Sequence, residues 1–387
     1  MSETTAPAAR RLELDWLRVL AIAAVFLFHS TRFFDLADWH VKNVVRYAFL
    51  DNVAMLVILW MMPMLFVISG ASTFYALRRR SAVEFLRDRT LRLGVPLLLG
   101  IFPLGAWQVY LDRLTHRQFT GSFWQFLPHY FEGRFGEGGN FAWMGVHLWY
   151  LFELFALSVI LLPLFVWLKK GAGKAALGWL GNQLARPGLV YLLAIPIMVL
   201  VARLDPRSFF GARNWGGWSA LGYIPFFLNG FLLVSNDRLY ESVRRWRWVS
   251  LLAAIGLTLL LLSWYRAWGD PRFGTARFTQ LFAVYGLCAW CWVLAVLGLA
   301  AQHLRKGVPF LAIANEGVLP FYILHQPVLL TVGYWVVRRP LPSLTKWAII
   351  TPVSLAICLG LYWFVIRRVN WLRFLFGLKP QAGRRDP

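Results

Sequence analysis

The stretch RRLELDWLRVLAIAAVFLFHS, residues 10 to 30, reads as an apolar segment, yet it carries Asp15 and Arg18 toward one end and His29 near the other. Arg18 and His29 are eleven residues apart, which on a helix is three turns plus about 20°, so they share one face. An imidazole suits proton transfer or nucleophilic attack, and a guanidinium suits holding a polar or anionic group. Asp15 falls on the same face and can pair with Arg18. The stripe predicts a polar path with two working points about 16 Å apart along the helix axis.

An alternative interpretation gives the same residues no chemical role. Asp15 and Arg18 would then reach the headgroups on the cytoplasmic side of a membrane, and His29 would lie at the outer interface. Composition alone favours neither interpretation, although ionisable groups are expensive to place in hydrocarbon.

A second candidate site is the arginine-rich stretch YALRRRSAVEFLRDRTLRLGVP, which holds six arginines and two acids between residues 78 and 92. Arg89 and Arg92 form an R-x-x-R pair on one helical face. Two fork-shaped guanidinium groups at this spacing suit a phosphate-bearing ligand on the cytoplasmic side. The alternative is that the loop only anchors the protein to anionic lipids of the inner leaflet.

Four further polar residues within apolar segments are candidates for supporting roles. His325 is about as deep in its segment as His29 is in the first one, if both helices rise at the ideal rate. Asn315 and Glu316 are expected near the level of Arg18, and Glu153 could orient a histidine or an arginine. For each of them a structural hydrogen bond is an equally good explanation.

Membrane-spanning helices must position these residues, because 59% of the 387 residues are hydrophobic, 15% are charged and the mean hydropathy is +0.55. A helix needs about 20 residues to cross the hydrocarbon. Ten segments qualify: 14–33, 53–77, 93–111, 146–168, 188–202, 217–235, 248–265, 279–301, 309–335 and 347–366. The sequence therefore predicts an all-α polytopic bundle.

The distribution of Lys and Arg predicts the topology. With the N-terminus inside, inner segments hold 24 of these residues and outer gaps hold 15, and the outer gaps also hold eight acids. Both termini are thus expected to be cytoplasmic. The expected organisation is a disordered tail at 1–11, a membrane domain at 12–370 and a basic cytoplasmic tail at 371–387. The net charge of +22 is spread over short gaps, which argues against a nucleic-acid partner.

The sequence contains no pattern for a bound cofactor or a metal. Cys288, Cys291 and Cys358 all lie within predicted spans, and we interpret them as buried small hydrophobic residues rather than as a redox pair. No soluble catalytic domain is expected, so any chemistry must take place within the membrane.

Several motifs together resemble the acyltransferase-3 family of integral membrane acyltransferases. In family order they are LDWLRVLA with the R-x10-H spacing of Arg18 and His29, MPMLFVISG at 62–70, the R-x-x-R of Arg89 and Arg92 followed by Gly94-Val95-Pro96, HLWYL at 147–151 and YILHQPV at 322–328. The resemblance covers residues 12 to 370. It looks closest to the branch with the osmoregulated periplasmic glucan succinyltransferase.

The resemblance implies an enzyme that takes an acyl group from cytoplasmic acyl-CoA and places it on a hydroxyl at the outer face, usually of a sugar. Acetyl-CoA or succinyl-CoA would be the co-substrate, and a glycan or another hydroxyl compound the acceptor. His29 would be the general base or would carry the acyl group transiently. Arg18 would hold the acyl-pantetheine end or orient His29, and Arg89 and Arg92 would meet the phosphates of CoA.

A non-enzymatic alternative is a multi-helix secondary transporter or flippase, because such proteins also combine many helices with intramembrane ionisable residues. The first five and the last five predicted spans do not match one another, whereas paired halves are common in transporters. The expected location is the inner membrane of a bacterium.

Overall fold

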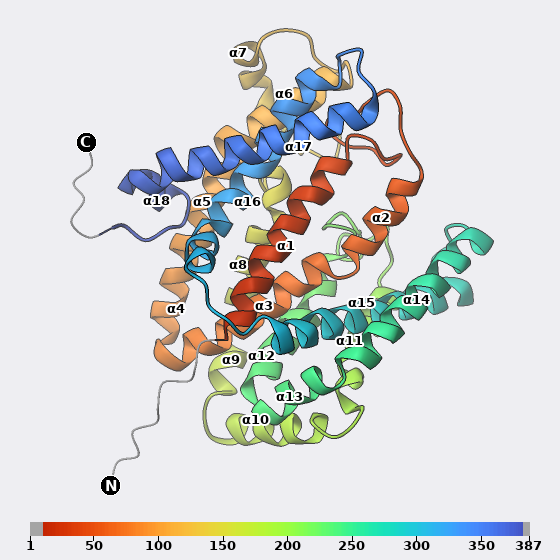
Figure 1. The fold of residues 1–387 in the computed structure, drawn as a ribbon, viewed down its shortest axis with the longest axis vertical. Coiled ribbons are helices and arrows are strands. Elements are labelled where there is room, and N and C mark those ends of the chain that lie inside the picture. The colour runs from red at the N-terminus through yellow and green to blue at the C-terminus, as the bar shows by residue number, and fades with distance from the viewer. Residues whose placement is uncertain (1–10, 382–387) are drawn as a thin grey trace.

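A computed structural model describes residues 11–381 and shows an all-helical protein (Figure 1). In this part of the chain the only strand-like pairings are three isolated bridges. The first nine α-helices are α1 (Leu12–Thr31), α2 (Phe49–Ile58), α3 (Met61–Arg79), α4 (Ala82–Arg89), α5 (Val95–Leu99), α6 (Gly105–Thr115), α7 (Phe123–Phe126), α8 (Trp149–Ile160) and α9 (Leu162–Trp167). The others are α10 (Gly171–Leu184), α11 (Ala194–Arg203), α12 (Tyr223–Ser235), α13 (Asp237–Arg245), α14 (Arg247–Trp268), α15 (Ala276–His303), α16 (Pro309–Val336), α17 (Ser343–Gly360) and α18 (Asn370–Leu375).

Short irregular turns join several of these helices into longer ones. Two π-helical turns, Thr90–Gly94 and Gly100–Leu104, flank α5, so that 82–115 runs as one bent helical segment. A proline in the second of these turns, Pro103, removes a backbone donor, and π-turns of this kind commonly bend helices. The last long segment continues from α17 through the π-turn Leu361–Val365 to Arg368.

The ten predicted spans correspond to helices of three kinds. Five coincide with helical segments that are long and apolar enough to cross a membrane: Phe49–Arg79, Ala82–Thr115, Arg247–Trp268, Ala276–His303 and Ser343–Arg368. Three fall on shorter apolar helices, Val146–Ile160, Leu189–Arg203 and Ala220–Ser235. The remaining two are α1 and α16, which carry the ionisable candidates. The helical class is confirmed, whereas ten crossings and cytoplasmic termini stay predictions.

Helix α1 lies in the middle of the molecule and packs against α3, α15, α16 and α17 (Figure 1). Helix α3 in turn packs closely on α12. A Cβ atom at Gly70 would collide with the carbonyl of Phe227, and one at Gly230 would collide with the carbonyl of Val67. The two glycines therefore let the backbones touch, as small residues do between membrane helices. This contact fixes the position of α3 beside the polar face of α1.

The segment predicted as a C-terminal tail, 371–387, is described as far as residue 381, and this part is packed against the bundle. Arg373 is buried and donates to a carboxylate oxygen of Glu316 at 2.7 Å. Phe376 and Leu378 are buried in the main core. Of the predicted N-terminal tail, 1–11, residues 1–10 lie outside the described residues. Arg11 lies over the ring of Tyr240, with its guanidinium carbon 3.8 Å from the ring centroid.

Candidate active site

The polar face of α1 meets two other helices at Arg18. The guanidinium donates to Asp15 Oδ1 at 3.2 Å, to Asn315 Oδ1 on α16 at 3.0 Å and to Ser72 Oγ on α3 at 2.9 Å. Asn315 also donates to Asp15 Oδ1 at 3.1 Å, which closes the network. Every charge in this cluster has a partner, so its burial cost is offset. Arg18 is thus held rigidly between three helices.

A cavity of about 750 Å³ opens beside Arg18 and extends to the arginine-rich segment. This volume is within the range of small-molecule and cofactor sites. Its basic lining consists of Arg11, Arg18, Arg78, Arg79, Arg80, Arg89 and Arg92. Its inner wall includes Ile22, Leu65, Tyr150 and Tyr322. One end of the cavity is therefore strongly cationic and suits an anionic ligand, and the other end is largely apolar.

Arg89 and Arg92 both line this cavity, as their spacing predicted, but in different environments. Arg89 donates to Thr73 Oγ1 of α3 at 3.1 Å and lies over the ring of Phe85 at 5.0 Å. Arg92 is exposed. Its backbone carbonyl lies so close to Gly377 of the C-terminal segment that a Cβ atom at position 377 would come within 2.7 Å of the carbonyl oxygen. Arg89 is thus positioned by packing, and Arg92 is free to move toward a ligand.

At the other end of α1, His29 forms a hydrogen bond with His325 of α16, whose Nε2 lies 3.0 Å from Nδ1 of His29. His325 Nδ1 lies 2.6 Å from the carbonyl oxygen of Tyr322, which can only accept, so Nδ1 of His325 carries the proton. In the neutral pair, Nε2 of His325 is then the acceptor and Nδ1 of His29 the donor. It follows that Nε2 of the half-buried His29 holds a free lone pair. This is the arrangement of a general base with an orienting partner.

A third histidine, His147, packs against this pair with its ring centroid 5.1 Å from that of His325. Its Nε2 lies 3.1 Å from the carbonyl of Tyr322 and 3.2 Å from that of Ile323. Pro327 has no N–H group and so leaves the Ile323 carbonyl without its helical partner, and His147 takes that place. The Tyr322 hydroxyl donates to the His147 carbonyl at 2.5 Å. The proline and His147 together fix the part of α16 that presents His325.

Tyr322 connects the two halves of the site. Its side chain belongs to the inner wall of the cavity, and its carbonyl accepts the hydrogen bond of His325. Neither His29 nor His325 is part of that wall. The cavity therefore ends short of the histidine pair, with Tyr322 between them.

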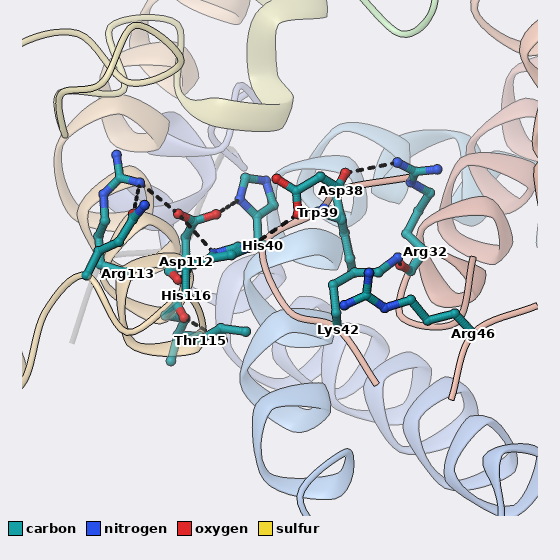
Figure 2. A network of polar contacts seen from close by, with 12 residues as sticks. Arg32, Asp38, Trp39, His40, Lys42, Arg46, Asp112, Arg113, Thr115 and His116 are labelled. Carbon is teal, nitrogen blue, oxygen red and sulfur yellow. Dashed lines mark hydrogen bonds and ion pairs between the residues drawn. The ribbon is translucent and has the colours of Figure 1, made fainter. Parts of the chain in front are cut away.

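Above the histidines, a network of charged side chains ties the segment after α1 to the end of α6 (Figure 2). Asp112 Oδ1 accepts from His40 Nδ1 at 3.0 Å, and its Oδ2 accepts from Arg113 at 3.2 Å. Arg113 also donates to Asn140 Oδ1 at 2.7 Å. The network closes over the end of α1 at which His29 lies.

Comparison with known proteins gives a family for this fold and site. The acyltransferase domain family matches residues 11–363, which is almost the whole chain. The chain belongs to the acyltransferase-3 family. With its long apolar helices it is a multi-pass integral membrane protein, and its family chemistry is acyl transfer.

Curated relatives of this acyltransferase-3 chain carry the name "Glucans biosynthesis protein C". The protein from Salmonella typhimurium is 24% identical over 393 residues, covering 98% of each chain. The protein from Salmonella typhi is 24% identical over 389 residues, covering 97% of each chain. These relatives fit the glucan-related branch that the sequence motifs indicated. No solved structure matches this acyltransferase-3 chain.

Two of the supporting candidates in this acyltransferase-3 chain, Glu316 and Glu153, form no hydrogen bond within residues 11–381 with Arg18 or with the histidine pair. Glu316 lines the cavity but bonds to Arg373, and its second oxygen lies 3.8 Å from Arg367. It anchors the C-terminal segment rather than Arg18. Glu153 is buried on α8, and within residues 11–381 no histidine or arginine forms a hydrogen bond or ion pair with it. Within the same range no group of three or more His, Cys, Asp or Glu side chains is arranged to hold a metal ion.

Sequence reasoning missed two residues of the site, His147 and Trp39. His147 stands at the start of the HLWYL motif, which contributed to the family resemblance and was the available signal. Trp39 stacks on His29, with ring centroids 6.0 Å apart and planes 10° from parallel. No pattern in the sequence distinguishes it from the other 20 tryptophans.

Proposed function

We propose that this protein is an O-acyltransferase that moves an acyl group from cytoplasmic acyl-CoA to a hydroxyl of a glycan at the outer face of the membrane. The observation that carries the proposal is the free Nε2 lone pair of His29, separated by Tyr322 from the apolar end of an arginine-lined cavity. A base and an anion-binding site joined in this way suit transfer from a phosphate-bearing donor.

Acyl-CoA would enter with its phosphates at the basic end of the cavity. Arg89 and Arg92 would contact these phosphates, for which guanidinium groups are well shaped. The acyl-pantetheine arm would follow the apolar inner wall past Arg18. Because Asp15 and Asn315 hold Arg18 in place, the guanidinium can contact a polar group of the arm without further reorganisation.

His29 would then act as the base in the transfer. Its Nε2 takes the proton of the acceptor hydroxyl, and the oxygen attacks the thioester carbon. The C–S bond breaks, an ester forms, and the CoA sulfur takes the proton from the imidazolium. The hydrogen bond to His325 stabilises the imidazolium while it exists. The alternative mechanism is direct attack of the same Nε2 atom on the thioester carbon, which gives a transient acyl-histidine and then passes the acyl group to the hydroxyl.

The acceptor class is inferred from the relatives, whose name refers to glucans. A glucan hydroxyl at the outer face of a bacterial inner membrane would meet His29 from the side opposite the cavity. The same residues would contact acetyl-CoA or succinyl-CoA as the donor.

The proposal is tested with membranes that contain the protein, supplied with acyl-labelled acetyl-CoA or succinyl-CoA and glucose oligosaccharides. We expect release of free CoA thiol that depends on the acceptor, with label appearing in ester-linked glycan. A secondary transporter or flippase would move a compound across the membrane without releasing thiol. Absence of acceptor-dependent thiol release with both donors would therefore contradict the proposal.

Substitution of the cavity arginines tests the donor site. Arg92→Ala is expected to raise the KM for acyl-CoA about 10- to 100-fold, because a hydrogen bond to a charged group contributes about 1.5–3 kcal/mol. Arg89→Ala should have a similar effect. Arg87→Ala is the matched control, since Arg87 is an exposed arginine of α4 outside the cavity lining. Equal KM values for the Arg92→Ala and Arg87→Ala variants would place the CoA phosphates elsewhere.

Substitution of His325 tests its role as the orienting partner of His29. His325→Ala is expected to lower kcat by about 10²-fold or more, because His29 loses the acceptor that sets its tautomer. The KM for acyl-CoA should stay within about twofold, since a change confined to the transition state leaves donor binding intact. His325→Gln retains an acceptor and should recover part of the rate. A Gln variant as slow as the Ala variant would argue against the tautomer role.

A further inference from the structure

The indole of Trp39 lies next to the His29 imidazole in a parallel, offset arrangement. The two rings are nearly parallel, 10° apart, with centroids separated by 6.0 Å. Trp39 is half-buried, and the ring of Phe33 meets it edge to face at 4.9 Å. The indole is thus part of the packed cover above His29 and still has accessible surface.

Charged groups on both sides of Trp39 hold it in this position. Its neighbour His40 is bonded to Asp112, as Figure 2 shows. On the other side Asp35, which is completely buried, is paired with both Arg32 and Lys42, the latter at 2.6 Å. Buried, doubly paired carboxylates hold loops far more firmly than exposed ion pairs do.

A base with a free lone pair needs such a cover. Any hydroxyl that reaches His29 Nε2 can be activated, and water is the most abundant one. Attack by water converts acyl-CoA into a carboxylic acid and free CoA, and the acyl group is lost. Excluding water from a reaction site prevents this side reaction. The face of an indole is suited to the task, since it repels water and stacks on the C–H face of a sugar ring.

We propose that Trp39 determines which nucleophile His29 activates. As the aromatic wall beside the imidazole, Trp39 admits a hydroxyl carried on a ring that can stack on the indole, and it excludes free water. This inference rests on the function proposed above and adds the residue that selects a sugar acceptor over water. The atoms balance in both outcomes: acyl-CoA and sugar hydroxyl give ester and CoA thiol, and acyl-CoA and water give carboxylic acid and CoA thiol.

The test compares Trp39→Ala and Trp39→Phe with the parent in membranes containing the full chain. Thiol release from labelled acyl-CoA is measured without acceptor and with glucose oligosaccharides, together with the label found as ester and as free acid. The matched control is Trp124→Ala, because the Trp124 side chain, on α7, is 76% exposed and its ring packs against the ring of Phe123.

We expect Trp39→Ala to raise the ratio of hydrolysis to ester formation at least tenfold, Trp39→Phe to lie between it and the parent, and Trp124→Ala to match the parent. A parent-like ratio in Trp39→Ala would overturn the inference. If Trp39→Ala loses both reactions, Trp39→Phe decides: a raised ratio supports the inference, and a parent-like ratio overturns it. A parent protein that releases no thiol with either donor would instead overturn the proposed function itself.

Discussion

Replacing His29 by alanine is expected to abolish acyl transfer while the protein remains folded in the membrane. General base catalysis contributes about 10²- to 10⁴-fold, and an acyl-histidine route would lose its nucleophile altogether. The side chain is only half-buried, and within residues 11–381 its hydrogen-bond partner is His325, so little packing is lost. The measurement is transfer of labelled acyl groups to glycan by equal amounts of parent and variant protein.

The matched control for His29 is His129→Ala, since the His129 side chain is 50% exposed and its ion-pair partner Glu132 is 66% exposed. This variant should transfer at the parental rate. Full activity of a correctly inserted His29→Ala protein would remove His29 from the mechanism. The Arg18 cluster and the histidine pair would then be structural polar contacts.

Replacing Arg18 by alanine is expected to lower both activity and stability. The guanidinium joins α1, α3 and α16 through Asp15, Ser72 and Asn315. Without it Asp15, only 8% exposed, loses its guanidinium donor, and loss of a hydrogen bond to a charged group costs about 1.5–3 kcal/mol. We expect a reduced melting temperature in detergent and a fall in kcat/KM of about 100-fold or more, which corresponds to about 2.7 kcal/mol.

A double variant separates the two effects of Arg18. Asp15→Asn combined with Arg18→Ala removes both partners of the ion pair and should recover part of the melting temperature, because replacing both partners is far less costly than removing one. Activity should stay low, since the group that faces the cavity is still missing. Arg18→Lys should also be poorly active, because an ammonium cannot donate to three partners with the planar geometry of a guanidinium. Recovery of activity in the double variant would mean that Arg18 acts only through stability.

Local sequence patterns were sufficient to predict part of the site and the family. The spacing of Asp15, Arg18 and His29 correctly placed the Asp15–Arg18 pair, because helical periodicity depends only on neighbours along the chain. The R-x-x-R spacing brought Arg89 and Arg92 to one cavity. The motifs also gave the acyltransferase-3 family, which the match over residues 11–363 confirms.

The depth of a residue along its helix predicted its contacts on a neighbouring helix less reliably than spacing within one helix did. His325 was expected at the level of His29, and a hydrogen bond does join the two rings although they are 296 residues apart in the sequence. Asn315 was expected at the level of Arg18 and contacts it. Glu316 is the next residue, and the turn of the helix points it to Arg373 instead. Depth can be counted from a sequence, but the rotation of one helix against another depends on packing.

The sequence by itself determined the class of the fold, the family and the residues with reactive side chains, because composition, helical period and motif spacing are properties of the chain. Only the tertiary structure decided which nitrogen of His29 is free. That outcome depends on His325, on the Tyr322 carbonyl and on an α16 backbone held by His147, all distant in sequence from His29. The cover by Trp39 likewise results from ion pairs that fold one loop back over the end of its own helix. Such contacts form between surfaces that exist only after the helices have packed.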